Sequence, residues 1–278
     1  MSINVPDAFK KKIIGAFGEE GKGWLHTIEE RVQTCVDMWN LVIEGPVSNL
    51  SYNYVLKAFD SENHPVILKL GVPSFDFRNE IHSIEAYAGD GCAKVVKADS
   101  ELGAMLLEQL VPGRMLSNET DEDLVLNWFV EVWKAIRRPV PIGFQGPTIM
   151  QWAQGLDKYL ESYQNEEPPI PFSAVNQARG YFDEITNSTE VLELLHGDLH
   201  HENILYSSEK GWMAIDPKGL LIKRINFLCK NLSLNRERLL KAAVALATLY
   251  ACWGIEDNDD WKQTYQCVEW FMELLNEI

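Results

Sequence analysis

In Leu194-Leu-His-Gly-Asp-Leu-His-His-Glu-Asn-Ile-Leu205 and the later Ala214-Ile-Asp-Pro217, a carboxylate at Asp198 precedes an amide at Asn203 and a second carboxylate at Asp216. Short apolar runs flank these polar groups, so we expect them in loops between buried segments. Phosphoryl transfer needs one Asp to accept the proton of the attacking hydroxyl, and an Asn and a second Asp to hold magnesium on the phosphates. We therefore predict Asp198 as the catalytic base, with Asn203 and Asp216 as Mg²⁺ ligands.

A cation for the phosphates is the next requirement, and Lys69 is the candidate. It lies in the apolar, strand-like segment 66–70. The first glutamate of a helix predicted over 75–88, Glu80, is expected to form an ion pair that holds Lys69 toward the α- and β-phosphates of ATP. Glu85 is the alternative partner. Lysine–glutamate pairs are common on protein surfaces, so the pair alone is weak evidence for a phosphate-binding site. Its position upstream of Asp198, Asn203 and Asp216 strengthens that interpretation.

The segment that would cover the phosphates is 44–51. It contains neither GxGxxG nor GxxxxGK[ST], which argues against a P-loop ATPase. Its backbone amides and the hydroxyls of Ser48 and Ser51 are candidates for phosphate contacts, and a plain turn is the equal alternative. The segment 108–111 follows a predicted strand, and we expect its backbone, around Glu108 and Leu110, to bind adenine as a hinge.

Three histidines, His196, His200 and His201, surround Asp198 in the sequence. A zinc site would need helical or CxxC-like spacing with further acidic or thiol ligands, and none is evident. We expect His196 to hydrogen-bond the loop backbone, and His200 and His201 to pack or hydrogen-bond near the cleft.

The spacing of apolar residues divides the chain into a mixed part and a helical part. Helices are predicted over 6–17, 20–39, 75–88, 121–136, 151–163, 172–185, 236–253 and 260–275, and strands over 39–44, 53–59, 66–70, 95–97, 104–108, 204–206 and 212–215. This order predicts an α+β chain with a nucleotide-binding small lobe over 1–111, including the N-terminal helices, and a helical catalytic and substrate-binding lobe over 112–278. Pro112–Gly113 is the expected junction.

The composition is that of a globular protein with a strongly acidic surface. Lys and Arg number 25 against 41 for Asp and Glu, a formal charge of −16. Such a surface repels nucleic acid and anionic membranes, and it favours a small cationic partner or simply solubility.

The five cysteines include no CxxC pair, the first residues lack a signal-peptide pattern, and no apolar run approaches the ~20 residues of a membrane span. We expect a cytoplasmic protein; the oligomeric state is left open.

The segment 195–204 together with Ile215-Asp-Pro217 resembles the catalytic loop and metal-binding Asp of the aminoglycoside phosphotransferases. The resemblance is closest to the streptomycin 6-kinase branch, the aminoglycoside/hydroxyurea resistance kinases. It spans roughly 39–258. Further matching stretches are Trp39-Asn-Leu41, Val66–Leu70, Leu106-Leu-Glu-Gln-Leu-Val-Pro-Gly113, Gly211-Trp-Met-Ala-Ile-Asp-Pro-Lys-Gly219 and Trp253-Gly-Ile-Glu-Asp-Asn258.

The resemblance implies a two-lobed protein-kinase-like fold, with a small mixed β-sheet N-lobe and a mostly helical C-lobe. It also implies transfer of the ATP γ-phosphate to an alcohol group of an aminoglycoside such as streptomycin, with Mg²⁺. The implied substrate contacts are His200 and His201 and the acidic side chains at Glu256 and Asp257, with Asp259 and Asp260 beside them. An ordinary solvated helix start is the alternative for the acidic group.

One departure concerns the segment after Gly219. Members of the family continue with a Gly-Asp/Glu segment and a further loop, whereas here 221–227 already has a helical pattern. A true deletion would weaken support of the magnesium site and part of the substrate wall. Such a deletion would favour a nucleotide-binding pseudokinase. Apart from it, a second alternative stays open, a kinase of another small metabolite such as a sugar or amino alcohol.

Overall fold

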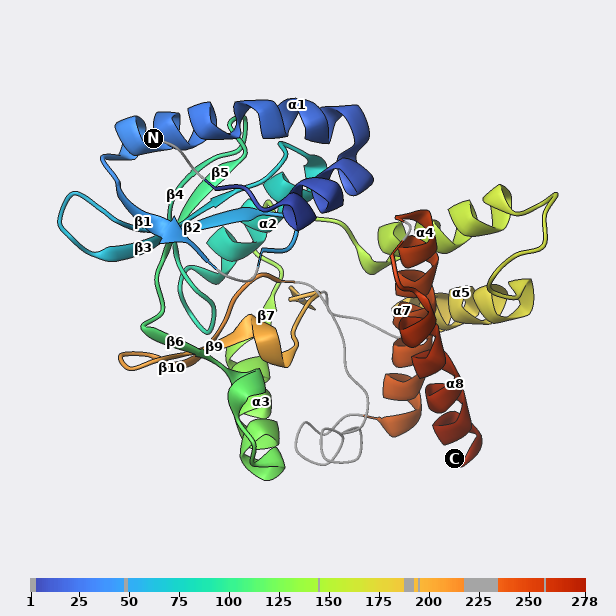
Figure 1. Ribbon diagram of the computed structural model, residues 1–278. Coiled ribbons are helices and arrows are strands. Elements are labelled where there is room, and N and C mark those ends of the chain that lie inside the picture. Colours follow the sequence, from blue (N-terminus) through green and yellow to red (C-terminus); the bar gives the residue numbers. More distant parts are fainter. Residues whose placement is uncertain are drawn as a thin grey trace. The chain divides into compact units, whose positions relative to one another are not determined.

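The computed structural model describes residues 4–47, 50–144, 146–187, 193–194, 196–217, 235–257 and 259–278 (Figure 1). The chain forms two compact units. Met1–Asn118 and Glu202–Pro217 make the first, which we call the sheet unit; Glu119–His201 and Lys218–Ile278 make the second, the helical unit. The hairpin that carries Asn203 thus belongs to the sheet unit. The lobe boundary after residue 111 stays a prediction.

A five-stranded antiparallel sheet forms the centre of the sheet unit, in the order β1-β2-β3-β5-β4. The strands are β1 Val42–Pro46, β2 Tyr54–Phe59, β3 Pro65–Leu70, β4 Val95–Asp99 and β5 Ala104–Glu108. Lys69 lies opposite Val55 of β2 and Met105 of β5. Side chains alternate between the faces of a sheet, so Lys69 and Met105 share one face.

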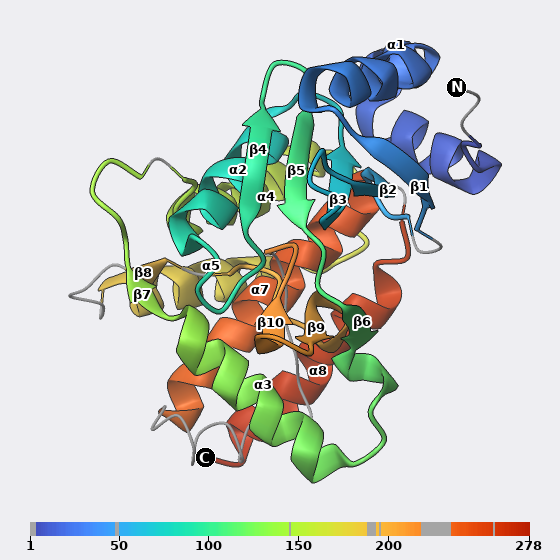
Figure 2. The same cartoon turned by 90° about the vertical axis from the view of Figure 1, so that its left-hand side faces the viewer.

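Two helices cover the two faces of this sheet (Figures 1 and 2). The helix α1, Asp7–Trp39, shares a buried cluster with Leu106 of β5, whereas α2, Phe75–Tyr87, packs on the adjacent Met105 and Leu107. Because neighbouring strand residues point to opposite sides, α2 covers the face that carries Lys69.

The helix α1 contains one break. Gly18 has φ 55°, a left-handed backbone inside an otherwise helical segment. The two helices predicted over 6–17 and 20–39 are therefore joined at this residue. The first predicted strand was placed too early, because Trp39 still belongs to α1 and β1 begins at Val42.

A smaller sheet, in the order β10-β9-β6, completes the sheet unit. It consists of β6 Pro112–Met115, β9 Ile204–Ser207 and β10 Gly211–Ala214, with the short 3₁₀ helices η1 Leu116–Asn118 and η2 His201–Asn203 beside them. Backbone hydrogen bonds of 2.9 Å join Ala214 to Gly91 and Ala93. These bonds attach β10 to the chain that leads into β4, and so hold the hairpin in this unit.

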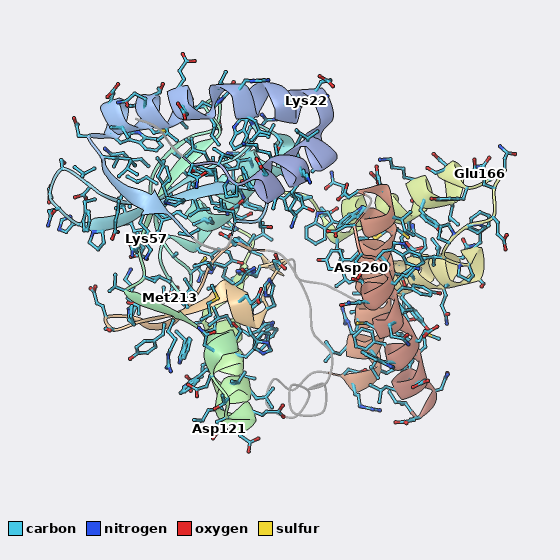
Figure 3. All side chains as sticks on the ribbon, viewed as in Figure 1. Lys22, Lys57, Asp121, Glu166, Met213 and Asp260 are labelled. Carbon is cyan, nitrogen blue, oxygen red and sulfur yellow. The ribbon has the colours of Figure 1, made fainter. Side chains whose placement is uncertain are left out.

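The helical unit contains α3 Glu122–Ile136, α4 Ile149–Ser162, α5 Phe172–Asn187, α7 Arg236–Glu256 and α8 Lys262–Asn276, with a two-stranded sheet of β7 Arg138–Pro139 and β8 Glu193–Leu194. The helices α4, α5, α7 and α8 pack together (Figure 1), and Asp260 lies just before α8 (Figure 3). Within the described ranges, α7 is long and apolar enough to cross a membrane, but half of its apolar window is buried. It packs between α5 and α8 as a core helix does.

Candidate active site

The sheet unit holds a buried lysine between two carboxylates. Lys69 Nζ lies 2.5 Å from Glu80 Oε1 and 2.8 Å from Asp216 Oδ1. The side chains of Lys69 and Glu80 are 3% and 5% exposed, whereas that of Asp216 is 44% exposed. The buried Glu80 carboxylate thus holds the ammonium group of Lys69 from the interior of the protein. The carboxylate of Asp216 contacts the same group from the side that faces solvent.

The electrostatics of this cluster favour a charged lysine. Burial opposes the charge on Lys69, but Asp216 and then Glu80 outweigh it, and the pKa of the ammonium group lies above its ordinary value. Coulomb attraction at these distances in a partly dry environment exceeds the cost of desolvating the cation. Lys69 therefore offers a permanent positive charge.

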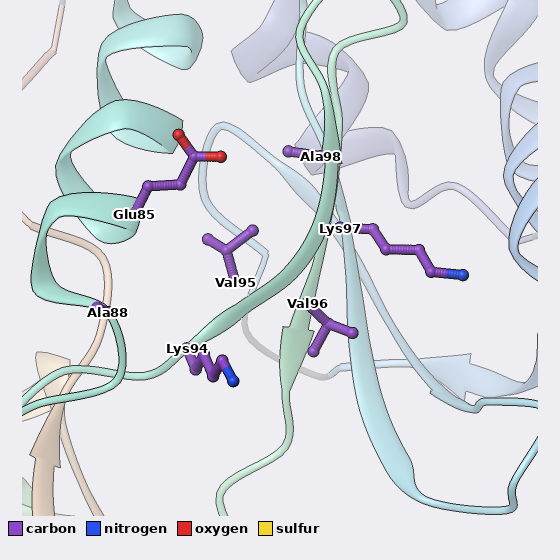
Figure 4. A pocket seen from close by; sticks show the side chains of 7 residues that line it. All are labelled: Glu85, Ala88, Lys94, Val95, Val96, Lys97 and Ala98. Atoms are coloured by element: carbon purple, nitrogen blue, oxygen red, sulfur yellow. The ribbon is translucent and has the colours of Figure 1, made fainter.

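Glu85, the alternative partner, lies elsewhere. It is on the C-terminal half of α2 and, with β4, lines a shallow pocket that also includes Lys94 and Val95 (Figure 4). The pocket contains none of the predicted site residues. The ion pair with Lys69 is made by Glu80, three residues after the buried Phe77 on the same helix face.

Asn203 and Asp216 lie together at the base of the β9–β10 hairpin. The amide nitrogen of Asn203 donates to the backbone carbonyl of Asp216 at 2.9 Å, and the amide of Ile215 donates to the Asn203 carbonyl at 2.8 Å. Asp216 has a positive φ of 48°. Since the side-chain nitrogen of Asn203 donates, its side-chain oxygen is the atom with acceptor capacity.

This donor set fits magnesium. A side-chain amide oxygen and a carboxylate are hard ligands, and Mg²⁺ usually takes only one or two carboxylates from the protein and completes its shell with phosphates and water. Over the residues that the structure describes, no group of three or more His, Cys, Asp or Glu side chains forms a protein-only metal cage.

Asp198 lies in a loop of the helical unit. The carboxylate is half-buried, and its Oδ1 lies 3.6 Å from His200 Nε2. The ring of His201 packs against Phe129 of α3 at 5.8 Å between centroids. His196 is buried, and its Nδ1 accepts a hydrogen bond from the backbone N–H of Asp198 at 3.3 Å, which is the role expected of it.

Sequence analysis missed one contact to this loop. The hydroxyl of Tyr250, on α7, donates to the carbonyl of Gly197 at 3.2 Å. Burial and then the charge of Asp198 raise the pKa of Tyr250 above its ordinary value. A tyrosine on an apolar helix looks like any core aromatic in the sequence, so no local signal indicated this contact.

The predicted hinge lies at the end of β5. The carboxylate of Glu108 accepts from the backbone N–H of Lys94 at 2.9 Å and pairs with Lys210, so it has structural partners. Leu110 is buried in an apolar cluster with Ala93 and Met213, against which Leu205 and Ile215 pack partly exposed. Ile215 adjoins Asp216 in the sequence and Leu205 follows Asn203 by two positions, and neither was selected from the sequence. Ser51 is exposed, and Ser48 lies outside the described residues.

The acidic residues at the end of α7 differ in their surroundings. Glu256 forms an exposed ion pair with Lys158 of α4. Partial burial, followed by the charges of Glu256 and Asp259, raises the pKa of Asp257.

Residues 218–234, where the sequence departs from the family pattern, lie outside the described residues.

The structure thus brings Lys69, Glu80, Asn203 and Asp216 together within the sheet unit, and places Asp198, His200 and His201 in the helical unit. The approach of Asp198 to the other set stays a prediction.

Known structures place the architecture in one class. The chain is similar to choline kinase LicA from Streptococcus pneumoniae, with a TM-score of 0.63 at 15% identity over 91% of this chain and 100% of that one. A choline/ethanolamine kinase family protein from Mesorhizobium loti gives a TM-score of 0.62 at 17% identity, over 90% and 94% of the two chains. The fold is therefore protein-kinase-like, as predicted.

Sequence comparison then defines the family. Residues 38–222 match the aminoglycoside/hydroxyurea antibiotic resistance kinases, and the chain belongs to this family of phosphotransferases. It is 25% identical to streptomycin 6-kinase of Streptomyces griseus over 285 residues, covering 92% of each chain. It is 24% identical to hydroxyurea phosphotransferase of Kitasatospora aureofaciens over 272 residues, covering 87% of this chain and 77% of that protein.

Proposed function

We propose that this protein transfers the γ-phosphate of ATP to a hydroxyl group of an aminoglycoside of the streptomycin type, and so inactivates the antibiotic. The observation that carries the proposal is the buried Lys69 cation, held by Glu80 and Asp216 beside the amide of Asn203. Family membership and the relative named streptomycin 6-kinase support the choice of acceptor.

In this proposal Lys69 binds the α- and β-phosphates. The Glu80 carboxylate keeps the ammonium group in place, and the charge of Lys69 is retained because its pKa is raised. Asn203 and Asp216 would hold Mg²⁺, which neutralises charge on the phosphates when it is bound with ATP. The partly exposed Leu205 and Ile215, with the backbone at Glu108 and Leu110, supply an apolar and hydrogen-bonding surface for adenine. Ser51 and Ser48 remain candidates for phosphate contacts.

Asp198 acts as the base. As the acceptor oxygen forms its bond to the γ-phosphorus, the hydroxyl proton passes to the Asp198 carboxylate. The bond between the γ-phosphorus and the bridging oxygen breaks at the same time, and ADP leaves. In this proposal His200, whose Nε2 lies 3.6 Å from Asp198 Oδ1, contacts the acceptor beside the base.

The acceptor we propose is cationic. The chain carries a formal charge of −16, and Glu256 and Asp257 lie at the end of α7, the helix that also carries Tyr250. Carboxylates attract guanidinium and ammonium groups through charge-assisted hydrogen bonds. We propose a cytoplasmic enzyme; among the described cysteines, Cys35, Cys92 and Cys252 are buried, as is usual for thiols in a reducing compartment.

A second acceptor has its own support. The relative named hydroxyurea phosphotransferase covers most of this chain at 24% identity, close to the value for streptomycin 6-kinase. Hydroxyurea also offers a hydroxyl group, so the same transfer needs no further residue of the protein.

A coupled ADP-release assay tests the proposal. The purified protein is given ATP with streptomycin, other aminoglycosides, hydroxyurea or small polyols, with and without Mg²⁺, and phosphorylated products are identified by mass spectrometry. Asp198→Asn should lower kcat by about 10²–10⁴-fold while ATP still binds. Asp37→Asn, an exposed substitution on α1, is the matched control and should behave as the wild type. Normal turnover by Asp198→Asn would refute the role of the base, and absence of transfer to every acceptor would refute the function.

A further inference from the structure

One peptide group next to Asp198 is held at both ends. Its carbonyl, that of Gly197, accepts from the Tyr250 hydroxyl at 3.2 Å, and its N–H, that of Asp198, donates to His196 Nδ1 at 3.3 Å. The two bonds act on opposite sides of a single planar unit, so together they fix its rotation about the chain axis. That rotation determines the direction in which the Asp198 side chain leaves the backbone.

The residue before Asp198 gives the loop little stiffness of its own. Gly197 has φ 75°, a left-handed backbone that glycine adopts without steric cost. Glycine is also free to leave this conformation, because no Cβ restricts it. An external restraint on the Gly197–Asp198 peptide therefore has more influence here than it would beside a residue with a side chain.

Tyr250 is itself firmly held. Its ring lies 5.5 Å from that of Trp253, one turn further along α7, and Trp253 in turn meets Trp152 of α4 edge-on at 6.0 Å. Its phenol stays protonated over the working pH range, because burial and the nearby Asp198 charge both raise its pKa. The hydroxyl therefore donates at every pH at which Asp198 could act as a base.

We propose that Tyr250 is a positioning residue: through its hydrogen bond to the Gly197 carbonyl it sets the direction of the Asp198 carboxylate. The proposal rests on the proposed function, in which Asp198 is the base. Small displacements of a reacting group cost a large part of the rate, since proton transfer and attack require near-contact geometry.

The competing explanation is that the hydroxyl only satisfies its own need for a hydrogen bond in a buried place. The chain offers a matched control for this. Tyr159 of α4 is another tyrosine of the helical unit, buried where Tyr250 is half-buried. Its hydroxyl bonds the backbone of Ile170, outside the Asp198 loop, accepting from the N–H at 2.8 Å and donating to the carbonyl at 3.3 Å.

The experiment compares Tyr250→Phe with Tyr159→Phe. Each removes one hydroxyl and keeps the ring. Tyr250→Phe should lower kcat by about 10–100-fold with the KM values for ATP and acceptor within twofold, whereas Tyr159→Phe should lower the thermal midpoint and leave kcat unchanged. In an Asp198→Asn background, Tyr250→Phe should cause no further loss, because both act through the same carboxylate. A wild-type kcat in Tyr250→Phe, or an undiminished loss in the Asp198→Asn background, would overturn the proposal.

A second readout does not depend on turnover. Amide hydrogen exchange in a peptide covering 196–200 should be faster in Tyr250→Phe than in the wild type, and unchanged in Tyr159→Phe. Unchanged exchange in Tyr250→Phe would overturn the proposal whatever the activity. If the wild type transferred phosphate to no acceptor while exchange rose as expected, the proposed function would fail and the restraint by Tyr250 would stand.

Discussion

Replacement of Lys69 by methionine tests the buried ion pair directly. Methionine keeps most of the length of the side chain but removes the charge, and the Glu80 carboxylate, 5% exposed, then has no cation. Removal of one partner of a buried pair typically costs about 3–5 kcal/mol. Asp216 is 44% exposed, so water screens its share of the loss, and we expect about 3 kcal/mol, the low end of that range.

The contribution of Lys69 does not change near neutral pH. Because the pKa of Lys69 is raised, its contribution is complete below the ordinary lysine value of ~10.4 and is lost only as the pH rises through the raised pKa. The wild-type contribution is therefore constant between pH 5.5 and 8.

Urea unfolding at pH 8 measures the loss. The double variant Lys69→Met/Glu80→Leu removes both charges and should recover most of it, because an apolar pair of similar volume is often neutral. Lys57→Met, an exposed lysine on β2 of the same sheet (Figure 3), is the control and should stay within about 0.5 kcal/mol of the wild type. If Lys69→Met lost no more than Lys57→Met, or if the double variant recovered nothing, the reasoning would be refuted.

Three further predictions concern single positions. Asp216→Asn, which keeps a side chain that tolerates the left-handed backbone, should abolish the Mg²⁺ dependence of ATP binding in calorimetry; an unchanged dependence would exclude Asp216 as a ligand. Gly155→Ala would place a Cβ 2.6 Å from Trp253 Nε1 and should lower stability by about 1–3 kcal/mol in thermal unfolding. Gly18→Ala, at φ 55°, should destabilise by about 1–2 kcal/mol. Gly23→Ala, at an open helical position, should stabilise by up to about 1 kcal/mol, and equal effects of these two would contradict the break in α1.

Local pattern predicted the long elements well. The apolar residues of α2 recur at helical spacing, and Phe77, Ile81, Ile84 and Tyr87 are all buried as that spacing requires. The strand β6 was not predicted, because a four-residue segment beginning Pro-Gly has no strand pattern of its own. It exists through pairing with β9, about 90 residues later in the chain, and sequence periodicity carries no information about such a partner.

In the candidate site, too, contacts between residues close in the sequence could be predicted, and contacts between distant residues could not. Lys69 and Glu80 are only 11 positions apart, so a strand followed by a helix was enough to predict their ion pair. The contact of Lys69 with Asp216 joins residues 147 positions apart, and that of Tyr250 with Gly197 joins residues 53 positions apart. Such contacts depend on how separate elements pack, which residue type and spacing do not determine. The side chain of Glu108 illustrates a different case: the position was selected from the sequence as part of a hinge, which stays a prediction, and its carboxylate pairs with Lys210.

The hairpin β9–β10 is attached to the larger sheet through Ala214, and this has a consequence for how the protein can change. The distances among Lys69, Asn203 and Asp216 are internal to one unit, and the acidic end of α7 belongs to the other. With the acceptor bound at the acidic end of α7, as proposed, substitutions there would alter the choice of acceptor without disturbing the groups proposed to bind the nucleotide. The proposal thus predicts that the two specificities can be changed separately, in evolution and in engineering.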